Sequence, residues 1–505
     1  MGCTLVALCG ESFLYCIYMP AVDISLSDCR GHFMAPSYLR RAGPGPQTFY
    51  NYPYDKTKEM ADSLDPADHS RGGPWWGRVN TDLGAGSGAR SSGEGVRPMP
   101  VLNDEQEKVG WVARIPCSVL ADTAHYTPGA GNAPNNGPDN ANGSPMPFLL
   151  QYGHGLFGSR DEINSGFLSK LADENKWILV ALDWAGMAQY DVPQAIRIMA
   201  SRLDEFASMP QRTVQGWAFD AMLMRLMGTA AMANLDAFKS PTTGSPMISA
   251  LQYAAGASSA TVAIQTGDIN VPGPLTAGYY GNSQGSVVGC GYCAYQQDIR
   301  RCTCGVPGSP FALILSRSAD FVPYYDALKL QMTHAQDIRL AIVLMQVLWD
   351  QGESAGWLRE MAPKGVLLQA GIGDAQVSNL GAELMARAYN ASFVQPQTRA
   401  VYGISEKTAP FHGSALVEWL YDDVPDSPAG DFGRSDGKDV HECPRREPAA
   451  QRQMREFLEG REVTQQCRGP TLPNTAVVCE SESCPSDYGP WPNSPTAIPP
   501  GGSGR

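Results

Sequence analysis

A serine between two glycines is the strongest chemical signal in the sequence. The five residues Gly281-Asn282-Ser283-Gln284-Gly285 follow the run LTAGYY and precede a stretch of small residues. This G-x-S-x-G pattern is typical of a sharp strand-to-helix turn that lifts the serine hydroxyl above the end of a strand. The N-terminus of the following helix favours developing negative charge. We therefore predict that Ser283 is a nucleophile.

A nucleophilic serine needs a base and an acid that orients the base. Asp374 comes just past the apolar run GVLLQAG, although a helix N-cap would suit it too. Asp320 is a second candidate for the acid, because it follows FALILS, which we interpret as a strand. For the base we favour His441, which lies in a loop before a helix, over His412, which lies in more apolar sequence. The resulting order is serine, aspartate, histidine, as in α/β-hydrolases.

The stretch YGHGLFG has two competing interpretations. The spacing of its glycines between Gly153 and Gly158 fits a dinucleotide fingerprint, with Asp183 as the ribose-binding acid of an NAD-linked oxidoreductase. Alternatively, the loop supplies one of two backbone N–H donors to an oxyanion, and Gln284, after the nucleophile, supplies the other. We favour the second interpretation, with Leu156 as the loop donor, because a histidine is unusual in a phosphate fingerprint. The fingerprint also leaves the serine, aspartate and histidine unexplained.

Two further residues are candidates for contact with the substrate. His154 lies inside the glycine-rich loop, where we expect it to anchor the loop by hydrogen bonds rather than to join a triad. Trp184 follows the second strand-like run, WILVALD, and suits either the lining of an acyl pocket or the core.

Most of the thirteen cysteines cluster in loop-like sequence, which is typical of disulfides formed in an oxidising compartment, and Cys117 stands alone. Cys290, Cys293, Cys302 and Cys304 have spacings that resemble a zinc site, but a C-x₂-C pair inside a buried helix is a poor metal cage. We expect core packing or disulfides there instead. Cys443 is a candidate for a disulfide that fixes the histidine loop. We therefore expect the protein to be secreted or to lie in the cell envelope.

Composition excludes several classes of partner. The chain has 505 residues and a formal net charge of −13, so a nucleic-acid partner is not expected. No run of 18 apolar residues occurs in the sequence, so no stable membrane span is expected either. Neither a metal nor an organic cofactor is required by the chemistry described above.

Alternating strand-like and helical runs predict an α/β fold, with a mostly parallel sheet covered by helices on both faces. We expect residues 1–105 to be irregular and loop-rich, and residues 106–467 to form the catalytic domain. A methionine-rich helical excursion at about 190–272 is interpreted as a cap or lid. Residues 468–505 form a tail rich in proline, glycine and serine.

The motifs YGHGLFG, GNSQG and GIGDAQV, together with a late histidine, resemble those of α/β-hydrolase serine esterases and lipases. The likeness is to bacterial secreted or cell-envelope lipases and esterases, and it spans about residues 105 to 460. It implies the α/β-hydrolase fold, a Ser-His-Asp triad, and a small-molecule or lipid ester as substrate. Asn282 stands where such lipases often carry histidine, which leaves the acyl preference open. A thioesterase, a peptidase or a non-catalytic surface-binding protein would share much of this pattern.

Overall fold

The computed structural model describes residues 29–36, 106–121, 147–233, 235–239, 244, 247–248, 277–296, 299–357, 364–421, 439–466 and 480–481. Its strands are β1 (Cys29–Pro36), β2 (Gln106–Arg114), β3 (Phe148–Gly153), β4 (Trp177–Leu182), β5 (Ala277–Asn282), β6 (Arg301–Gly305), β7 (Gly365–Gly371), β8 (Ser392–Gln395), β9 (Glu406–Thr408), β10 (Ala415–Tyr421) and β11 (Glu480–Ser481).

The helices of the same residues are α2 (Cys117–Ala121), α3 (Gly166–Asn175), α4 (Val192–Ser201), α5 (Ser208–Met227), α6 (Ala230–Ala233), α7 (Gln284–Val287), α8 (Gly289–Tyr295), α9 (Phe311–Leu315), α10 (Val322–Lys329), α11 (Ala335–Trp349), α12 (Asn379–Ala388), α13 (Cys443–Arg446) and α14 (Pro448–Leu458).

One mostly parallel sheet organises the described residues. Its strand order is β1-β2-β4-β3-β5-β6-β7-β10-β8-β9, with β11 beside β10. The pairs β1–β2 and β2–β4 are antiparallel, and all the other pairs are parallel. The carboxyl ends of β3 to β7 and of β10 therefore meet at one edge of the sheet, where ligands bind in open α/β sheets.

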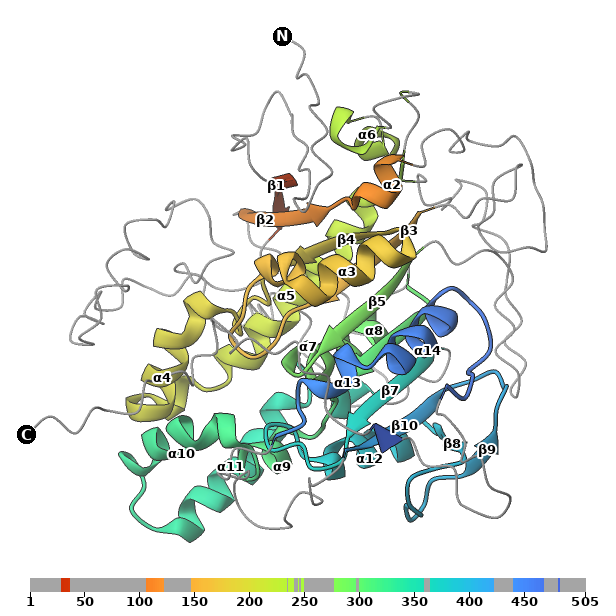
Figure 1. Cartoon of the computed structure of the whole chain (residues 1–505). Coiled ribbons are helices and arrows are strands. Elements are labelled where there is room, and N and C mark those ends of the chain that lie inside the picture. Colours follow the sequence, from red (N-terminus) through yellow and green to blue (C-terminus); the bar gives the residue numbers. More distant parts are fainter. Residues whose placement is uncertain are drawn as a thin grey trace, which may run out of the picture.

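Both faces of the sheet are buried, as the continuous apolar runs of its central strands require. On one face, Phe148 and Leu150 of β3 share a core with Leu168 of α3 and Phe457 of α14. On the other face, Leu149 belongs to the core that α5 and α8 complete. Figure 1 shows α3 and α14 lying across one face of the sheet, with α5 and α8 behind it. Helices on both faces are thus as the sequence predicts.

The excursion after β4 is partly a core element. Most residues of helix α5 are buried. Gly216 of this helix packs against the backbone of Ala185, because a Cβ added to Gly216 would lie 3.1 Å from Ala185 N. Gln151 of β3 donates to Asp220 Oδ1 of this helix at 2.8 Å. The described part of the expected cap therefore includes a helix that covers the sheet. Residues 249–272 of the expected cap lie outside the described residues.

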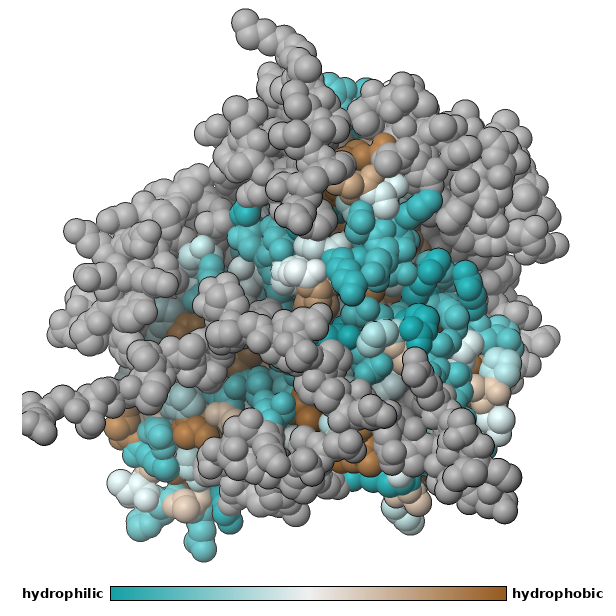
Figure 2. Space-filling view, in the orientation of Figure 1, coloured by the Kyte–Doolittle hydropathy of each residue, from teal (hydrophilic) through white to brown (hydrophobic). Residues whose placement is uncertain are grey.

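A second helical excursion lies between β6 and β7 and comprises α9, α10 and α11. The sequence interpretation of FALILS as a strand is wrong, because this run forms helix α9. The strand is the preceding RCTCG, which is β6. Helix α11 exposes the apolar side chains Leu340, Val343, Leu344 and Val347. Figure 2 shows brown surface at the lower left, where α10 and α11 lie in Figure 1.

Strand β1 lies within the segment that we expected to be irregular. It pairs with β2 over its whole length, from Cys29 opposite Ala113 to Pro36 opposite Gln106. Within the described part of the chain, no helix is both long enough and apolar enough to cross a bilayer.

Candidate active site

Ser283 stands on a strained turn between β5 and α7. Its backbone has φ 56° and ψ −125°, a conformation that is costly for a residue with a side chain. The turn is held from both sides, because Ser283 N donates to Gly305 O at 3.0 Å and the Ser286 hydroxyl donates to Ser283 O at 2.7 Å. Such strain, maintained by neighbouring contacts, is typical of a nucleophile turn.

The glycines around Ser283 are required by close backbone contacts. A Cβ on Gly281 would lie 2.1 Å from the carbonyl oxygen of Gly285. A Cβ on Gly285 would lie 2.1 Å from the carbonyl oxygen of Gly153, at the end of β3. The motif thus has glycine at both positions because the serine turn packs directly on itself and on the glycine-rich loop.

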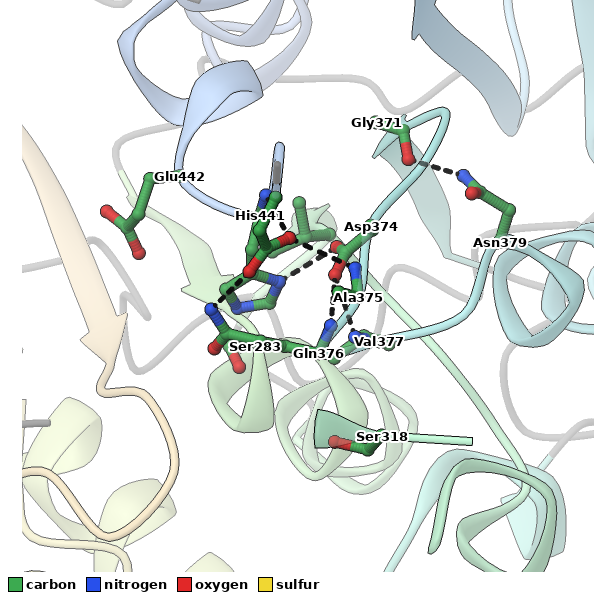
Figure 3. Close-up of polar contacts among 12 residues, drawn as sticks. Ser283, Ser318, Gly371, Asp374, Ala375, Gln376, Val377, Asn379, His441 and Glu442 are labelled. Carbon is green, nitrogen blue, oxygen red and sulfur yellow. Dashed lines mark hydrogen bonds and ion pairs between the residues drawn. The ribbon is translucent and has the colours of Figure 1, made fainter. Parts of the chain in front are cut away.

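Asp374 and His441 come from the loops after β7 and β10, and their side chains meet. His441 Nδ1 lies 2.8 Å from Asp374 Oδ2, and both side chains are buried (Figure 3). The other carboxylate oxygen of Asp374 accepts from the amides of Gln376 at 2.9 Å and Val377 at 2.8 Å. The sequence left open whether Asp374 caps a helix or orients a histidine. In the structure it binds the histidine and also closes its own loop.

Serine, aspartate and histidine therefore follow β5, β7 and β10 at one edge of the sheet, in the order expected from the sequence. The protein has the α/β-hydrolase fold.

Burial and the contact with Asp374 shift the pKa of His441 in opposite directions. Burial lowers the pKa of His441, but the adjacent Asp374 carboxylate outweighs burial and raises the pKa to about 9. Burial also raises the pKa of Asp374, and the His441 ring opposes that shift. Because Nδ1 faces the carboxylate, Nε2 is the nitrogen left to exchange a proton with another group.

No hydrogen bond joins Ser283 Oγ to His441 among the described residues. In the view of Figure 3, Ser283 lies on the side of the His441 ring opposite to Asp374. Catalytic hydrogen bonds are often long without substrate and tighten when substrate binds. The alternative base, His412, lies at the surface, where its Nε2 is 3.6 Å from Glu462 and its side chain is 43 % exposed.

The glycine-rich loop of this α/β-hydrolase fold is fixed by Glu162. One carboxylate oxygen of Glu162 accepts from Gly155 N at 2.8 Å, and the other accepts from the Tyr152 hydroxyl at 2.9 Å. Leu156, next in the loop, lines a pocket together with Ser283 and Gln284. Gln284 is the first residue of α7, so its amide has no partner inside that helix.

His154 and Trp184, the two candidates for substrate contact, are not among the residues that line that pocket. His154 accepts a hydrogen bond from Trp184 N at 2.8 Å through Nε2, and its Nδ1 lies 2.9 Å from Gly155 O. Burial lowers the pKa of His154, which favours the neutral ring that these two bonds require. Trp184 is buried and packs its ring against Tyr279 and Tyr292. Both residues thus support the loop rather than line the pocket.

The features of the dinucleotide interpretation have other roles in the structure. Asp183, which the dinucleotide interpretation made the ribose-binding acid, accepts from Arg160 N at 2.7 Å and forms an ion pair with Arg160 Nη1 at 3.2 Å. A Cβ on Gly153 would lie 2.0 Å from the Tyr279 hydroxyl, so this glycine serves contacts within the protein. The loop leads into a 3₁₀ helix, η3 (Arg160–Asn164), and not directly into an α-helix.

The pocket beside Ser283 is small and partly open to solvent. Its lining is mostly apolar and consists of Leu156, Ser283, Gln284, Val287, Phe311, Ile314, Asp320, Phe321, Gln376 and Val377. Sequence reasoning missed the wall that α9 and the following 3₁₀ helix η8 (Ala319–Phe321) contribute. A strand was expected there, and no local motif marks a pocket wall.

The four central cysteines form two disulfides, Cys290–Cys304 and Cys293–Cys302, which join α8 to β6. This confirms the disulfide alternative for these residues and leaves them no thiolates for zinc. Cys443, two residues after the histidine, is also disulfide-bonded. Cys467, a possible partner for it, lies outside the described residues.

Comparison with known proteins gives similarities of structure only. No family model matches the chain, and no curated protein sequence matches it. Among solved structures, a 2,6-dihydroxy-pseudo-oxynicotine hydrolase aligns with TM-score 0.33 and 12 % identity, over 71 % of this chain and 67 % of that one. Carboxyl esterase 2 from the mycorrhizal fungus Tuber melanosporum aligns with TM-score 0.31 and 13 % identity, over 70 % of this chain and 81 % of that one.

An S-formylglutathione hydrolase from Agrobacterium tumefaciens aligns with TM-score 0.29 and 10 % identity, over 62 % of this chain and 83 % of that one. The assignment of the fold rests on the strand order and on the places of Ser283, Asp374 and His441 described above.

Proposed function

We propose that the protein hydrolyses carboxylic esters through an acyl-enzyme on Ser283. The observation that carries this proposal is the strained serine at the same sheet edge as the buried Asp374–His441 pair, beside an apolar pocket. A strained serine turn positions a nucleophile, and the aspartate–histidine pair can accept its proton.

In the proposed mechanism, Ser283 Oγ attacks the ester carbonyl carbon while His441 Nε2 takes the hydroxyl proton. Asp374 holds Nδ1 and stabilises the imidazolium. The amides of Leu156 and Gln284 bind the oxyanion, and each contributes on the order of 10²–10³ in rate. His441 returns the proton to the leaving alcohol, and then accepts a proton from water as the water attacks the acyl-enzyme. Collapse of the second tetrahedral intermediate releases the acid and restores Ser283.

The pocket favours a short acyl or alcohol group. The space beside Ser283 is small, and its lining is mostly apolar. We therefore propose esterase activity on small esters rather than on long-chain lipids. The same serine chemistry would cleave thioesters or activated amides, so the leaving group is a separate question.

The test is hydrolysis of p-nitrophenyl acetate, butyrate, octanoate and palmitate by the wild type and by Ser283→Ala. We expect activity on the two short esters that falls by at least about 10⁴-fold in the mutant, because removing one triad member removes the covalent route. Ser201→Ala, at an exposed serine on α4, is the matched control and should keep full activity. A folded wild type that is inert, or a Ser283→Ala variant that is as active as the wild type, would overturn the proposal.

A further inference from the structure

Asp320 is a carboxylate in the wall of the pocket that the proposed mechanism does not use. It lies in η8 and lines the pocket together with Ser283 and Gln284. Two backbone contacts fix this segment: Ala319 N donates to Ala375 O at 2.9 Å, and the Ser318 hydroxyl accepts from Asp320 N at 3.1 Å. The backbone at Asp320 is thus held, while its side chain faces the pocket.

Within the part of the chain that the structure describes, the neighbouring carboxylates have partners and the Asp320 carboxylate has none. Asp374 binds His441, as described above. The Asp439 carboxylate accepts from Ala375 N at 3.0 Å and from His441 N at 3.1 Å. Glu442 forms an ion pair with Arg445, with 3.0 Å between Oε1 and Nη1. Among the described residues, no hydrogen-bond donor and no Lys or Arg within ion-pair distance serves the Asp320 carboxylate.

A partly buried carboxylate that has no partner among the described residues is unfavourable for folding. The pKa of Asp320 is raised to about 6, chiefly by burial; His441 lowers it, and the three neighbouring acidic groups add to the rise. The group is therefore still mostly ionised at neutral pH. A ligand that carries a positive charge would supply the partner that the Asp320 carboxylate lacks among the described residues.

The side chains around Asp320 restrict the kind of cationic group that can bind there. Phe311 and Phe321 line the same pocket, and their rings meet edge to face with centroids 6.2 Å apart. Ile314 and Leu156 add further apolar wall. A metal ion such as Ca²⁺ needs six or more oxygen ligands, which this lining does not offer. Aromatic rings beside one carboxylate instead suit an alkylated ammonium group, which needs few hydrogen bonds and binds over ring faces.

We propose that Asp320, Phe311 and Phe321 form a subsite for an alkylated ammonium group, so that the protein prefers cationic esters over neutral ones. This inference rests on the proposed ester hydrolysis and specifies the class of its substrate. It makes Asp320 a specificity-determining residue and leaves Asp374 as the partner of the histidine.

The test compares esters that differ only in charge. On the alcohol side, 2-(trimethylammonio)ethyl acetate is compared with 3,3-dimethylbutyl acetate. On the acyl side, p-nitrophenyl 4-(trimethylammonio)butanoate is compared with p-nitrophenyl 5,5-dimethylhexanoate. For at least one pair we expect wild-type kcat/KM to favour the cationic ester by about tenfold or more, a factor typical of a cation bound by aromatic rings and a carboxylate. Asp320→Asn should reduce that ratio to near one.

Asp326→Asn is the matched control, because this exposed acid on α10 pairs with Lys329 at 2.7 Å, outside the pocket. It should keep the wild-type ratio. Equal loss on both members of each pair in Asp320→Asn would overturn the inference, because Asp320 would then act on the base itself. A wild type that shows no preference in either pair would overturn it as well.

Binding separates failure of this inference from failure of the proposed function. Calorimetric titration with choline, on wild type, Ser283→Ala and Asp320→Asn, needs no turnover. If no ester is hydrolysed, the proposed function fails, yet choline binding that only Asp320→Asn loses would still support the subsite. If choline binds none of the three proteins, the subsite does not exist.

Discussion

The serine turn is held by backbone contacts, whereas the aspartate–histidine pair is held by charge and side-chain hydrogen bonds. In the turn, Gly281 and Gly285 leave no room for even one added carbon. In the pair, one 2.8 Å contact between Asp374 and His441 joins two loops that are 67 residues apart in the chain. The first half of the site therefore depends on shape and the second half on ionisation.

Because of this difference, substitutions in the turn and in the pair should have different effects. A substitution in the turn should act on folding, because the close contacts are part of the packing between β3 and β5. A substitution in the pair should act on activity and on its pH dependence while the fold persists. Three experiments on these residues test this distinction.

The largest effect is expected from Asp374→Asn. The amide cannot stabilise the imidazolium as a carboxylate does and can hold the ring in the wrong tautomer, so kcat should fall by about 10³–10⁴-fold. The circular dichroism spectrum should stay that of the wild type. Asp439→Asn, whose carboxylate contacts the His441 amide and not its ring, is the comparison. If both variants lose activity equally, Asp374 has no special role as the partner of the histidine ring.

The second largest effect is expected when the activity of the wild type is measured as a function of pH. A base must be neutral to accept the serine proton, and His441 has its pKa raised to about 9. In the free protein, kcat/KM should therefore rise with pH and level off above about pH 9, with a gain of roughly fiftyfold from pH 7 to pH 9. The measurement is kcat/KM for a p-nitrophenyl ester from pH 6 to pH 10, corrected for spontaneous hydrolysis. A profile that is flat above pH 7 would contradict the raised pKa.

The smallest effect is expected in the free energy of unfolding of Gly285→Ala. Its methyl group would lie 2.1 Å from Gly153 O, so the backbone must shift, at a cost of about 1–3 kcal/mol. Gly166→Ala, where nothing lies within 4 Å of the added carbon, is the matched control and should be neutral or stabilising. Urea denaturation measures both variants. Equal stabilities would show that the turn is less tightly packed than its contacts indicate.

The sequence was most informative where chemistry depends on local backbone shape. The G-x-S-x-G pattern predicted the turn at Ser283 because its strain and its glycines are local properties. Asp374 and His441 could be ranked because each follows a strand or precedes a helix at the right place in the chain order. Their side chains meet in the structure, and their catalytic roles remain predictions until the variants are measured.

The residues of the pocket wall could not be predicted from the sequence in the same way. FALILS is a short apolar run, and such runs do not distinguish a strand from a buried helix turn. The true strand, RCTCG, has no clear alternation, and its cysteines pair with α8 through two disulfides. The place of Asp320 beside the serine depends on this tertiary arrangement, which is why the sequence offered it only as an alternative acid. For His154 and Trp184 the sequence offered both substrate contact and a structural role, and in the structure they support the glycine-rich loop and the core.

The carboxylate in the pocket wall also bears on what happens after the reaction. Ester hydrolysis turns a neutral acyl group into an anion, and this anion forms at Ser283, in the pocket that already contains Asp320. Two negative charges in a mostly apolar enclosure repel each other more strongly than they would in water. An acid product without a positive charge of its own is therefore driven out of the site. Such a product should inhibit the enzyme weakly and should be a poor acyl donor for the reverse reaction, ester synthesis.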